Sequence, residues 1–212
     1  WKTPLPGLMI VNMGIDNLYG EYKNLLVAPV SLKNTLLDLI KEEIEKAKAG
    51  EETSIFLKMN SLTDRQLIDA LKEASQSGVK IKMIIRGICC ILPGIEGKTD
   101  NIEVISVVGR FLEHSRIFCF GTGENMKMYI ASADWMTRNT ENRVEIAAPI
   151  YDQKIKNSIY DTLRIMWKDN LKARILCSDG TYKKPEIKEG DELIDCQNYL
   201  RHEYKVGRKI KL

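Results

Sequence analysis

The chain has 212 residues, which is long enough for one well-buried core with short appendages. Hydrophobic residues make up 44% of it and charged residues 29%, an ordinary balance for a globular protein, and no internal repeat or low-complexity segment is present. Because 32 basic residues face 29 acidic ones, charge alone indicates no nucleic-acid partner, and no apolar run is long enough to predict a membrane span.

The first residues and the cysteines bear on the expected location. The chain opens on Trp1 with no basic head before an apolar run, so we expect no signal peptide and interpret the chain as a fragment. Residues 1–24 would then connect to a missing upstream domain. The five cysteines contain no C-x-x-C pair, and with only two histidines a zinc site is not expected. We predict reduced thiols and a cytoplasmic location, with attachment to the periphery of the inner membrane as a further possibility.

From residue 25 the sequence alternates strand-like and helical patterns. Apolar runs predict three buried strands, at 25–29, 53–59 and 79–85. Apolar residues at helical spacing predict two helices, at 32–48 and about 64–77. Ser31 is the expected N-cap of the first helix, and Gly50 ends it. Strands that alternate with helices in this way imply parallel pairing, with helices on the faces of the sheet.

The pattern changes after residue 88, where a long loop with Pro and Gly begins. Short strands follow at 103–108, 116–121, 126–132 and 143–150. Their close spacing predicts antiparallel hairpins, with residues 121–125 as one turn. Two more helices are expected, at about 152–169 and 191–204, before a basic tail at 205–212. The predicted fold is α/β, a mixed sheet flanked by helices over residues 25–177, followed by a polar extension at 178–212 with a short helix.

Arginine is distributed unevenly along the chain. Between Arg86 and Arg143 lie five of the ten arginines but only two of the 22 lysines. A planar guanidinium binds phosphate through two parallel hydrogen bonds, so this enrichment indicates an oxyanion site. Arg86 ends a predicted parallel strand, where open α/β sheets bind their ligands. For any single arginine, an ordinary ion pair with a nearby glutamate is an equally open alternative, the candidates being Glu113, Glu141 and Glu145.

A predicted hairpin brings further polar residues to the same edge. His114 and Arg116 are two residues apart at the start of a strand, so their side chains share a face. Ser132 and Asp134 follow the next strand directly, and Arg143 is expected to begin the strand after that. Pairing 116–121 with 126–132 would place these groups together. The convergence predicts that His114 lies in a phosphate-binding active site.

These residues also carry a resemblance to a known superfamily. His114-x-Arg116 followed by Ser132-x-Asp134 resembles the phospholipase D pattern of His-x-Lys followed by Gly-Ser-x-Asn. Here Arg replaces Lys, Ala131 replaces Gly and Asp134 replaces Asn. In that superfamily the histidine attacks phosphorus, and the chemistry normally needs two such motifs where this chain has one. The resemblance implies a phospholipase D-like fold and leaves a phosphodiesterase or nuclease as one alternative.

A second resemblance is longer. Five blocks, in order and at similar spacing, are similar to the C-terminal domain of bacterial polyphosphate kinase: LLVAP (25–29), KMNSLTD (58–64), GVKIKMIIRGICC (78–90), VVGRFLEHSRIF (107–118) and YIASADWMTRNTENRVE (129–145). The similarity covers about residues 8 to 178. It implies reversible transfer of the γ-phosphoryl group of ATP to inorganic polyphosphate.

The same resemblance implies a division of labour with a preceding domain. The phosphorylated histidine and the Mg²⁺ ligands belong to that upstream domain, so no metal ligand is expected in this chain. Arg86 would contact the nucleotide phosphates, and Arg143 would be a further phosphate ligand. His114 would be the second essential histidine. Its partners would be ATP or ADP, polyphosphate and the upstream domains of the same polypeptide, in an enzyme expected to be a homo-oligomer.

The remaining expectations concern the residues around His114 and the activity of the chain by itself. Arg116 is expected to contact phosphate, with Ser132 and Asp134 as supporting residues. His202, near the C-terminus, has no converging polar partners and is interpreted as a surface residue. One domain supplies only half of a site, so the isolated chain is expected to be inactive. A non-catalytic module that binds anionic chains is therefore the other alternative.

Overall fold

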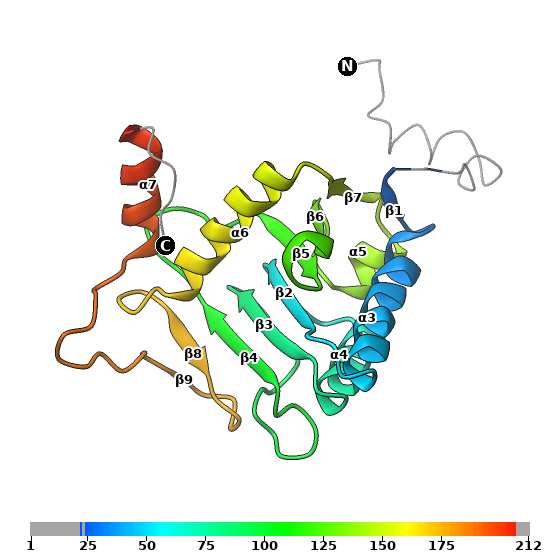
Figure 1. Ribbon diagram of the computed structural model, residues 1–212, viewed down its shortest axis with the longest axis horizontal. Coiled ribbons are helices and arrows are strands. Elements are labelled where there is room, and N and C mark those ends of the chain that lie inside the picture. Colours follow the sequence, from blue (N-terminus) through cyan, green and yellow to red (C-terminus); the bar gives the residue numbers. More distant parts are fainter. Residues whose placement is uncertain (1–21, 23, 207–212) are drawn as a thin grey trace.

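The computed structural model describes residue 22 and residues 24–206 (Figure 1). The rest of the predicted connector at 1–24 and residues 207–212 of the basic tail lie outside these residues. The strands are β1 (Leu26–Ala28), β2 (Ser54–Met59), β3 (Lys80–Ile85), β4 (Ile102–Ser106), β5 (Arg116–Phe120), β6 (Lys127–Ala131), β7 (Glu145–Ile150), β8 (Arg174–Leu176) and β9 (Tyr182–Lys183). The helices are α3 (Leu32–Lys48), α4 (Arg65–Gln76), α5 (Thr137–Glu141), α6 (Gln153–Trp167) and α7 (Cys196–Val206), with one 3₁₀ turn, η1 (Gly123–Asn125).

The strands form one sheet in the order β1-β7-β6-β5-β2-β3-β4-β8-β9. Strands β2, β3 and β4 are parallel, which confirms the predicted parallel pairing of β2 with β3. The antiparallel pairing expected for β4 is wrong, because β5 pairs with β2 on the far side of β3. β1 was expected among the parallel strands but pairs antiparallel with β7, because α3 carries the chain from β1 at the edge of the sheet to β2 at its centre. On either side of them the pairing is antiparallel, including the predicted hairpin of β5 and β6. The mixed α/β fold predicted from the sequence is confirmed.

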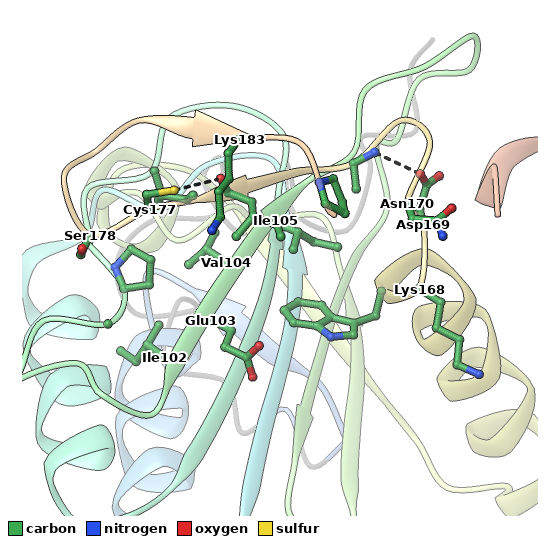
Figure 2. Close-up of a pocket in the computed structure, with 17 residues that line it drawn as sticks. Ile102, Glu103, Val104, Ile105, Lys168, Asp169, Asn170, Cys177, Ser178 and Lys183 are labelled. Carbon is green, nitrogen blue, oxygen red and sulfur yellow. Dashed lines mark hydrogen bonds between the residues drawn. The ribbon is translucent and has the colours of Figure 1, made fainter. Parts of the chain in front are cut away.

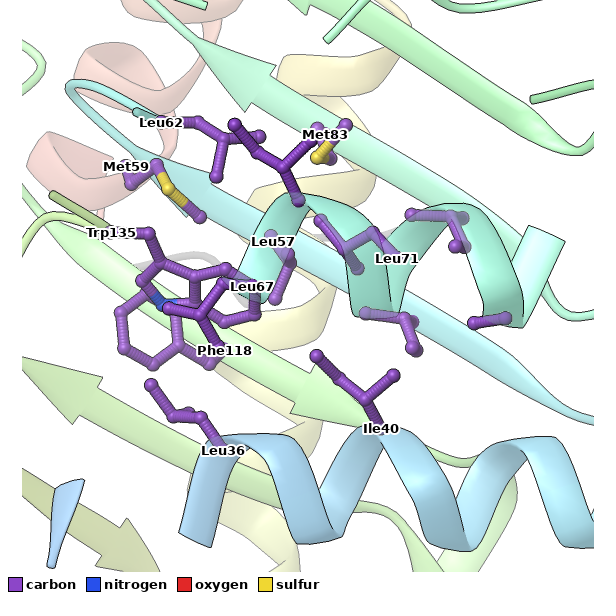
Figure 3. Close-up of a cluster of buried hydrophobic side chains, with 14 of the residues drawn as sticks. Leu36, Ile40, Leu57, Met59, Leu62, Leu67, Leu71, Met83, Phe118 and Trp135 are labelled. Atoms are coloured by element: carbon purple, nitrogen blue, oxygen red, sulfur yellow. The ribbon is translucent and has the colours of Figure 1, made fainter. Parts of the chain in front are cut away.

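Two apolar cores lie on opposite faces of the sheet. Helices α3 and α4 cover one face, where Leu36, Ile40, Leu67 and Leu71 meet Leu57, Phe118 and Trp135 (Figure 3). Helix α6 covers the other face, which includes Phe56. Neighbouring residues of β2 therefore enter different cores, as the alternation of side chains along a strand requires.

The helix boundaries follow local sequence signals. Asp64 caps α4 by accepting hydrogen bonds from the backbone N–H groups of Gln66 and Leu67, at 3.1 and 3.2 Å. Ser31 precedes α3, but its side chain does not cap the helix, contrary to the prediction. Its hydroxyl instead accepts from the Val27 N–H at 3.1 Å, which ties the end of β1 to the start of α3.

Other differences from the prediction lie after residue 106. Arg143 does not begin a strand, because β7 starts at Glu145 and the unpredicted helix α5 occupies 137–141. The strand expected at 103–108 ends at Ser106, and the last helix starts at Cys196 rather than at 191. These errors occur where elements are short and have no apolar period to mark them.

The segment after residue 178 packs on the rest of the molecule. β9 pairs with β8 at the edge of the sheet. Cys196, Tyr199 and Leu200 of α7 belong to the same core as α6. No described helix is both long and apolar enough to cross a membrane.

Candidate functional site

The predicted polar residues meet in a cleft at one edge of the sheet. β6 runs in the same direction as β2, since each is antiparallel to β5, so the ends of β2 and β6 lie beside the start of β5. The cleft has a volume of about 640 Å³. Its lining residues are Asn60, Ser61, Arg86, His114, Arg116, Ser132, Asp134, Arg138, Asn139, Arg143 and Glu145. The structure thus brings together all six residues that the sequence singled out.

Backbone bonds beyond the strands hold this edge together. Leu62 forms isolated bridges with both Cys89 and Trp135. The Leu62 N–H donates to the Ile88 carbonyl at 2.8 Å, and the N–H groups of Thr63 and Asp64 donate to the Trp135 carbonyl at 2.8 and 2.9 Å. The segments that follow β2, β3 and β6 are therefore fixed to one another, which is the condition for a pre-formed site.

Asp134 accepts five hydrogen bonds from residues of the cleft. It is 7% exposed, and its carboxylate accepts from the Asn60 N–H at 2.7 Å. The two Oδ atoms also accept hydrogen bonds from Nε and Nη2 of Arg116, at 3.3 and 3.0 Å. Burial alone would raise the pKa of Asp134, but the bonds from Arg116 and Asn60 outweigh it and hold the pKa below its ordinary value. Asp134 is therefore a charged anchor for Arg116.

Arg116 connects this anchor to His114. Its Nη1 donates to the His114 carbonyl at 2.8 Å and lies 2.9 Å from Nδ1 and 3.3 Å from Nε2 of the imidazole. A guanidinium has donors only, so a ring nitrogen that bonds to it is the acceptor. The imidazole of His114 is exposed and lines the cleft, while Arg116 binds the backbone carbonyl of the same residue. Arg116 thus orients His114, and much of its own charge is neutralised by Asp134.

Arg86 is positioned by Asn60, which the sequence analysis did not single out. Nε of Arg86 donates to Asn60 Oδ1 at 2.5 Å, and Asn60 Nδ2 donates to Asp134 Oδ2 at 3.3 Å. Gly87 adds a backbone bond, because its N–H reaches the Asn60 carbonyl at 2.8 Å. A polar residue directly after a buried strand was the available signal. Asn60 couples the arginine to the same anchor as His114.

The ion pairs considered as an alternative for the arginines do not form. Glu113 pairs with Lys58 at 3.3 Å, and Glu141 pairs with Lys33 at 2.6 Å. Glu145 accepts from the Ser132 hydroxyl and from Asn139 Nδ2. Within residues 24–206, Arg86, Arg138 and Arg143 have no carboxylate partner. Unpaired guanidinium groups around one cleft are what an anionic ligand requires.

Helix α5 supplies the part of the cleft wall that the sequence analysis missed. Thr140 donates from Oγ1 to the buried Asp64 at 2.9 Å, which fixes α5 to the start of α4. The helix then presents Arg138 and Asn139 to the cleft. Asn139 is 4% exposed, and its Oδ1 has no hydrogen-bond partner in the structure. Five residues without an apolar period gave no sign of this helix in the sequence.

The charges of the lining favour an anion over a metal ion. Four arginines line the cleft against two carboxylates, Asp134 and Glu145, and both carboxylates are engaged by protein donors. Among the described residues no group of three or more His, Cys, Asp or Glu could hold a metal ion. The described residues therefore do not fit a Mg²⁺ site, and no step that depends on a metal is assigned to them.

Two other features lie outside this cleft. A pocket of about 450 Å³ between β4, β8 and the end of α6 has a mixed lining without arginine, which includes Glu103, Ile105 and Lys183 (Figure 2). His202 is a surface residue, as predicted, with its side chain 68% exposed and its Nδ1 3.3 Å from Glu203. Neither feature combines unpaired guanidinium groups with a histidine.

Comparison with known proteins identifies the family. The profile described as polyphosphate kinase C-terminal domain 2 matches residues 25–197. The chain belongs to this family. Polyphosphate kinase of Thermosynechococcus vestitus is 50% identical over 171 residues, which are 81% of this chain and 23% of the relative. That of Halalkalibacterium halodurans is 46% identical over 177 residues, 84% of this chain and 25% of the relative. The chain thus spans about a quarter of the length of these relatives.

Solved structures agree with this result. Polyphosphate kinase from Porphyromonas gingivalis superposes with a TM-score of 0.84 at 37% identity, covering 88% of this chain and 28% of that one. A phospholipase D family member, Nuc from Salmonella typhimurium, superposes with a TM-score of 0.51 at 16% identity, covering 76% of this chain and 97% of Nuc. The second likeness concerns the fold alone. Both resemblances predicted from the sequence, to the kinase family and to the phospholipase D-like fold, are confirmed.

Proposed function

We propose that this domain supplies the nucleotide- and polyphosphate-binding half of a kinase site, in which the γ-phosphoryl group of ATP is transferred reversibly to inorganic polyphosphate. The observation that carries the proposal is the cleft with three guanidinium groups that no carboxylate of the described residues neutralises, set around one exposed histidine. Phosphoryl transfer depends mainly on positioning and on neutralising charge over the phosphoryl oxygens. Membership of the polyphosphate kinase family supports this choice of anion.

The side chains divide into those that meet the phosphates and those that hold them. Arg86 and Arg143 bind phosphate oxygens as fixed, permanently charged groups. Arg116 adds its remaining positive potential and orients His114, while Asp134 fixes Arg116. Ser132 has a supporting role, because its hydroxyl donates a hydrogen bond to the Glu145 carboxylate and accepts one from the Ile146 N–H at 3.1 Å.

The proposed reaction balances as a phosphoryl transfer with an enzyme-bound intermediate. The bond between the γ-phosphorus and the β–γ bridging oxygen of ATP breaks and ADP leaves. The phosphoryl group passes through a histidine of an upstream domain to a terminal oxygen of polyphosphate. His114 donates a hydrogen bond from its ring to a phosphoryl oxygen during these steps, which the exposure of His114 to the cleft permits. It is a helper and not the covalent carrier.

The same proposal covers the setting of the domain. Relatives about four times longer support an upstream part that carries the phosphorylated histidine and the Mg²⁺ ligands. Residues 25–177 would be the phospholipase D-like unit and 178–212 its extension, in a homo-oligomeric enzyme. Five free cysteines support a cytoplasmic location, and attachment to the periphery of the inner membrane remains part of the prediction.

Substitutions in the full-length enzyme test this proposal. His114→Ala and Arg86→Ala should each lower turnover by at least about 10²-fold, the usual scale for a positioned acid or an oxyanion donor. His202→Ala is the matched control, since the second histidine is exposed on α7, and its turnover should stay within about twofold. Equal losses from both histidine substitutions would contradict the assignment.

A chromogenic phosphodiester separates this proposal from the phosphodiesterase alternative. Arg116 and Asp134 neutralise each other where the phospholipase D pattern has Lys and Asn. No hydrolysis is expected from the chain. Hydrolysis that disappears in His114→Ala would instead support a phospholipase D-type activity.

A further inference from the structure

The loop at 107–115, here called the His114 loop, is tied to the C-terminal helix by Gln197. Gln197 of α7 is 7% exposed and accepts at Oε1 from the Phe111 N–H at 3.0 Å. Its Nε2 donates to the Phe111 carbonyl and to Glu113 Oε1, both at 2.8 Å. These bonds join residues 84 to 86 positions apart in the chain. Gln197 thus pairs with the loop backbone as a neighbouring strand would.

Close packing accompanies these bonds. A Cβ placed on Gly109 would lie 2.5 Å from Gln197 Oε1. Since real Cβ atoms do not approach so closely, a side chain at Gly109 would require the Gln197 amide to move. The loop and the amide of Gln197 are therefore fitted to each other on two sides.

Glu113 links Gln197 to strand β2 of the sheet. Its Oε2 lies 3.3 Å from Nζ of Lys58, a lysine of β2 whose side chain is 2% exposed. Nζ also donates to Ser115 Oγ at 2.8 Å and to the Ser115 carbonyl at 3.2 Å. Burial lowers the pKa of Lys58, and Glu113 opposes this shift. Glu113 and Ser115 flank His114, so both neighbours of the histidine are bound to the sheet.

Helix α7 is itself fixed at its start. Asp169, which is 2% exposed, accepts from the Cys196 N–H at 2.8 Å. The same carboxylate accepts from the N–H groups of Leu171, Lys172 and Ala173, at 3.1, 2.7 and 3.0 Å. The residue before Gln197 is therefore held to the turn after α6. This gives Gln197 a fixed position from which to hold the loop.

Among the apolar side chains of the His114 loop, Val107 at its start is buried in the core beside α6, and the others are exposed. Val108, Phe111 and Leu112 are 65%, 44% and 71% exposed. Burial of these side chains therefore does little to determine the loop conformation, and the polar ties must do so. Arg86 is held differently, by Asn60, and has no bond to α7.

We propose that Gln197 and Glu113 are positioning residues for His114, so that α7 is part of the phosphoryl-transfer site. This inference rests on the proposed function. His114 must meet a phosphoryl oxygen at hydrogen-bond distance, and a displacement of about 1 Å can cost on the order of 10²-fold in rate. The bonds of Gln197 and Glu113 restrict that displacement from one side and those of Arg116 from the other.

Steady-state kinetics of the full-length enzyme test the effect on catalysis. Gln197→Ala should lower kcat by roughly 10- to 10²-fold and leave KM for ATP within about twofold, because Arg86 keeps its own support. Gln76→Ala is the matched control: its amide also ties a helix to a loop, donating to the Gly97 carbonyl at 2.9 Å, but outside the cleft. An equal fall in kcat for both variants, or a change confined to KM, would overturn the proposal.

A double variant that exchanges the side chains at positions 113 and 197 distinguishes a positioning role from simple unfolding of α7. Glu113→Gln combined with Gln197→Glu reverses donor and acceptor, so the side chains can still bond to each other and position 197 can still accept from Phe111. The exchange also removes the donor to the Phe111 carbonyl and the carboxylate beside Lys58, so full recovery is not expected. The double variant should nevertheless have a higher kcat than Gln197→Glu alone, which places two carboxylates together. A double variant no better than that single variant would contradict the proposal.

Measurements on the 212-residue chain separate this inference from the kinase function. The chain has two histidines, so His202→Gln assigns the imidazole resonances in an NMR spectrum. Gln197→Ala should shift the His114 resonance and speed amide exchange of Phe111 by about tenfold or more, whereas Gln76→Ala should do neither. If neither signal responds to Gln197→Ala, the positioning role is wrong even if the kinase function holds. If both respond but His114→Ala leaves turnover intact, the proposed function is wrong instead.

Discussion

The ion pair of Asp134 with Arg116 shows how the departure from the phospholipase D pattern changes the contacts within the cleft. Where that pattern has Lys and Asn, this chain has Arg116 and Asp134, which form an ion pair at 3.0 Å with side chains 11% and 10% exposed. A carboxylate and a guanidinium match each other in two parallel bonds. Arg116 is thereby held rigidly beside His114, and the positive charge available to a ligand comes from Arg86, Arg138 and Arg143.

Two buried carboxylates predict how stability depends on pH. Hydrogen bonds outweigh burial and lower the pKa of both Asp134 and Asp169. The unfolded chain then binds more protons than the folded one near the ordinary aspartate pKa of about 3.9, so stability rises with pH there. The contribution of these two carboxylates to the free energy of unfolding should be fully present above about pH 5. It should be lost as the pH falls through their pKa values in the folded chain. Urea midpoints of the chain from about pH 6 to pH 2.5 measure this loss.

Single substitutions assign the pH effect. Asp169→Asn should flatten part of the acid dependence, because one of the two carboxylates that titrate is gone. Asp38→Asn, on the exposed side of α3, should leave it unchanged. A stability that stays level or increases below about pH 4 would show that these carboxylates are not held in their charged form.

Elements with a clear apolar period could be predicted from the sequence. Helices α3, α4 and α6 and the parallel strands have such patterns, because one face of a helix or both faces of a central strand must be buried. Helix α5 and strand β9 have five and two residues, and tertiary contacts fix them. In α5 the decisive contact is Thr140 to Asp64, between residues 76 positions apart, which no local pattern reveals.

The candidate site was predicted in outline for a similar reason. Strand direction places Arg86, His114 and Ser132 at one edge, and direction follows from the order of the elements. Asn60 and Gln197 were missed because they act through hydrogen bonds to residues far away in the sequence, and Asn139 because it lies in the short helix α5. Sequence patterns thus indicated which groups meet the ligand but not what holds them.

The turn after β3 gives a prediction for an element rather than a side chain. A Cβ on Gly87 would lie 2.8 Å from the Asn60 carbonyl oxygen and 3.0 Å from Ser61 Oγ. The first of these atoms is backbone and cannot move aside cheaply, so Gly87→Ala should displace the turn that carries Arg86. We expect affinity of the chain for tripolyphosphate to fall roughly 10-fold, measured by calorimetry.

An exposed residue of the following loop provides the control for this variant. Glu96→Ala should leave the affinity within about twofold. If Gly87→Ala binds tripolyphosphate as well as the wild type does, the tight packing of Asn60 against this turn is not needed for the position of Arg86.

At the scale of the whole molecule, nearly balanced charge coexists with a local cluster of arginines around the cleft. The net charge is +3, yet four arginines line the cleft against two carboxylates. A sheet with a core on each face keeps the site rigid from both sides, and α7 extends that support across the edge. We therefore expect polyphosphate to bind at this cleft, mainly through electrostatic attraction to the arginines.

Salt dependence of binding tests that expectation on the 212-residue chain. Labelled polyphosphate should bind weakly, with affinity falling steeply between about 50 and 200 mM salt, and without any transfer to ADP. Arg86→Ala combined with Arg143→Ala should remove most of the salt dependence, whereas Lys41→Ala, on α3, should not. Binding that is insensitive to salt, or turnover by the chain alone, would contradict the half-site.

The central claim is that His114 assists transfer and does not carry the phosphoryl group. Brief labelling of the full-length enzyme with [γ-³²P]ATP tests it directly, with the labelled peptide identified after digestion. The account predicts that label is found on an upstream histidine, that it still forms in His114→Ala at a reduced rate, and that its passage to polyphosphate is slowed at least about 10²-fold. Label on His114 itself, surviving removal of the upstream histidine, would contradict the account.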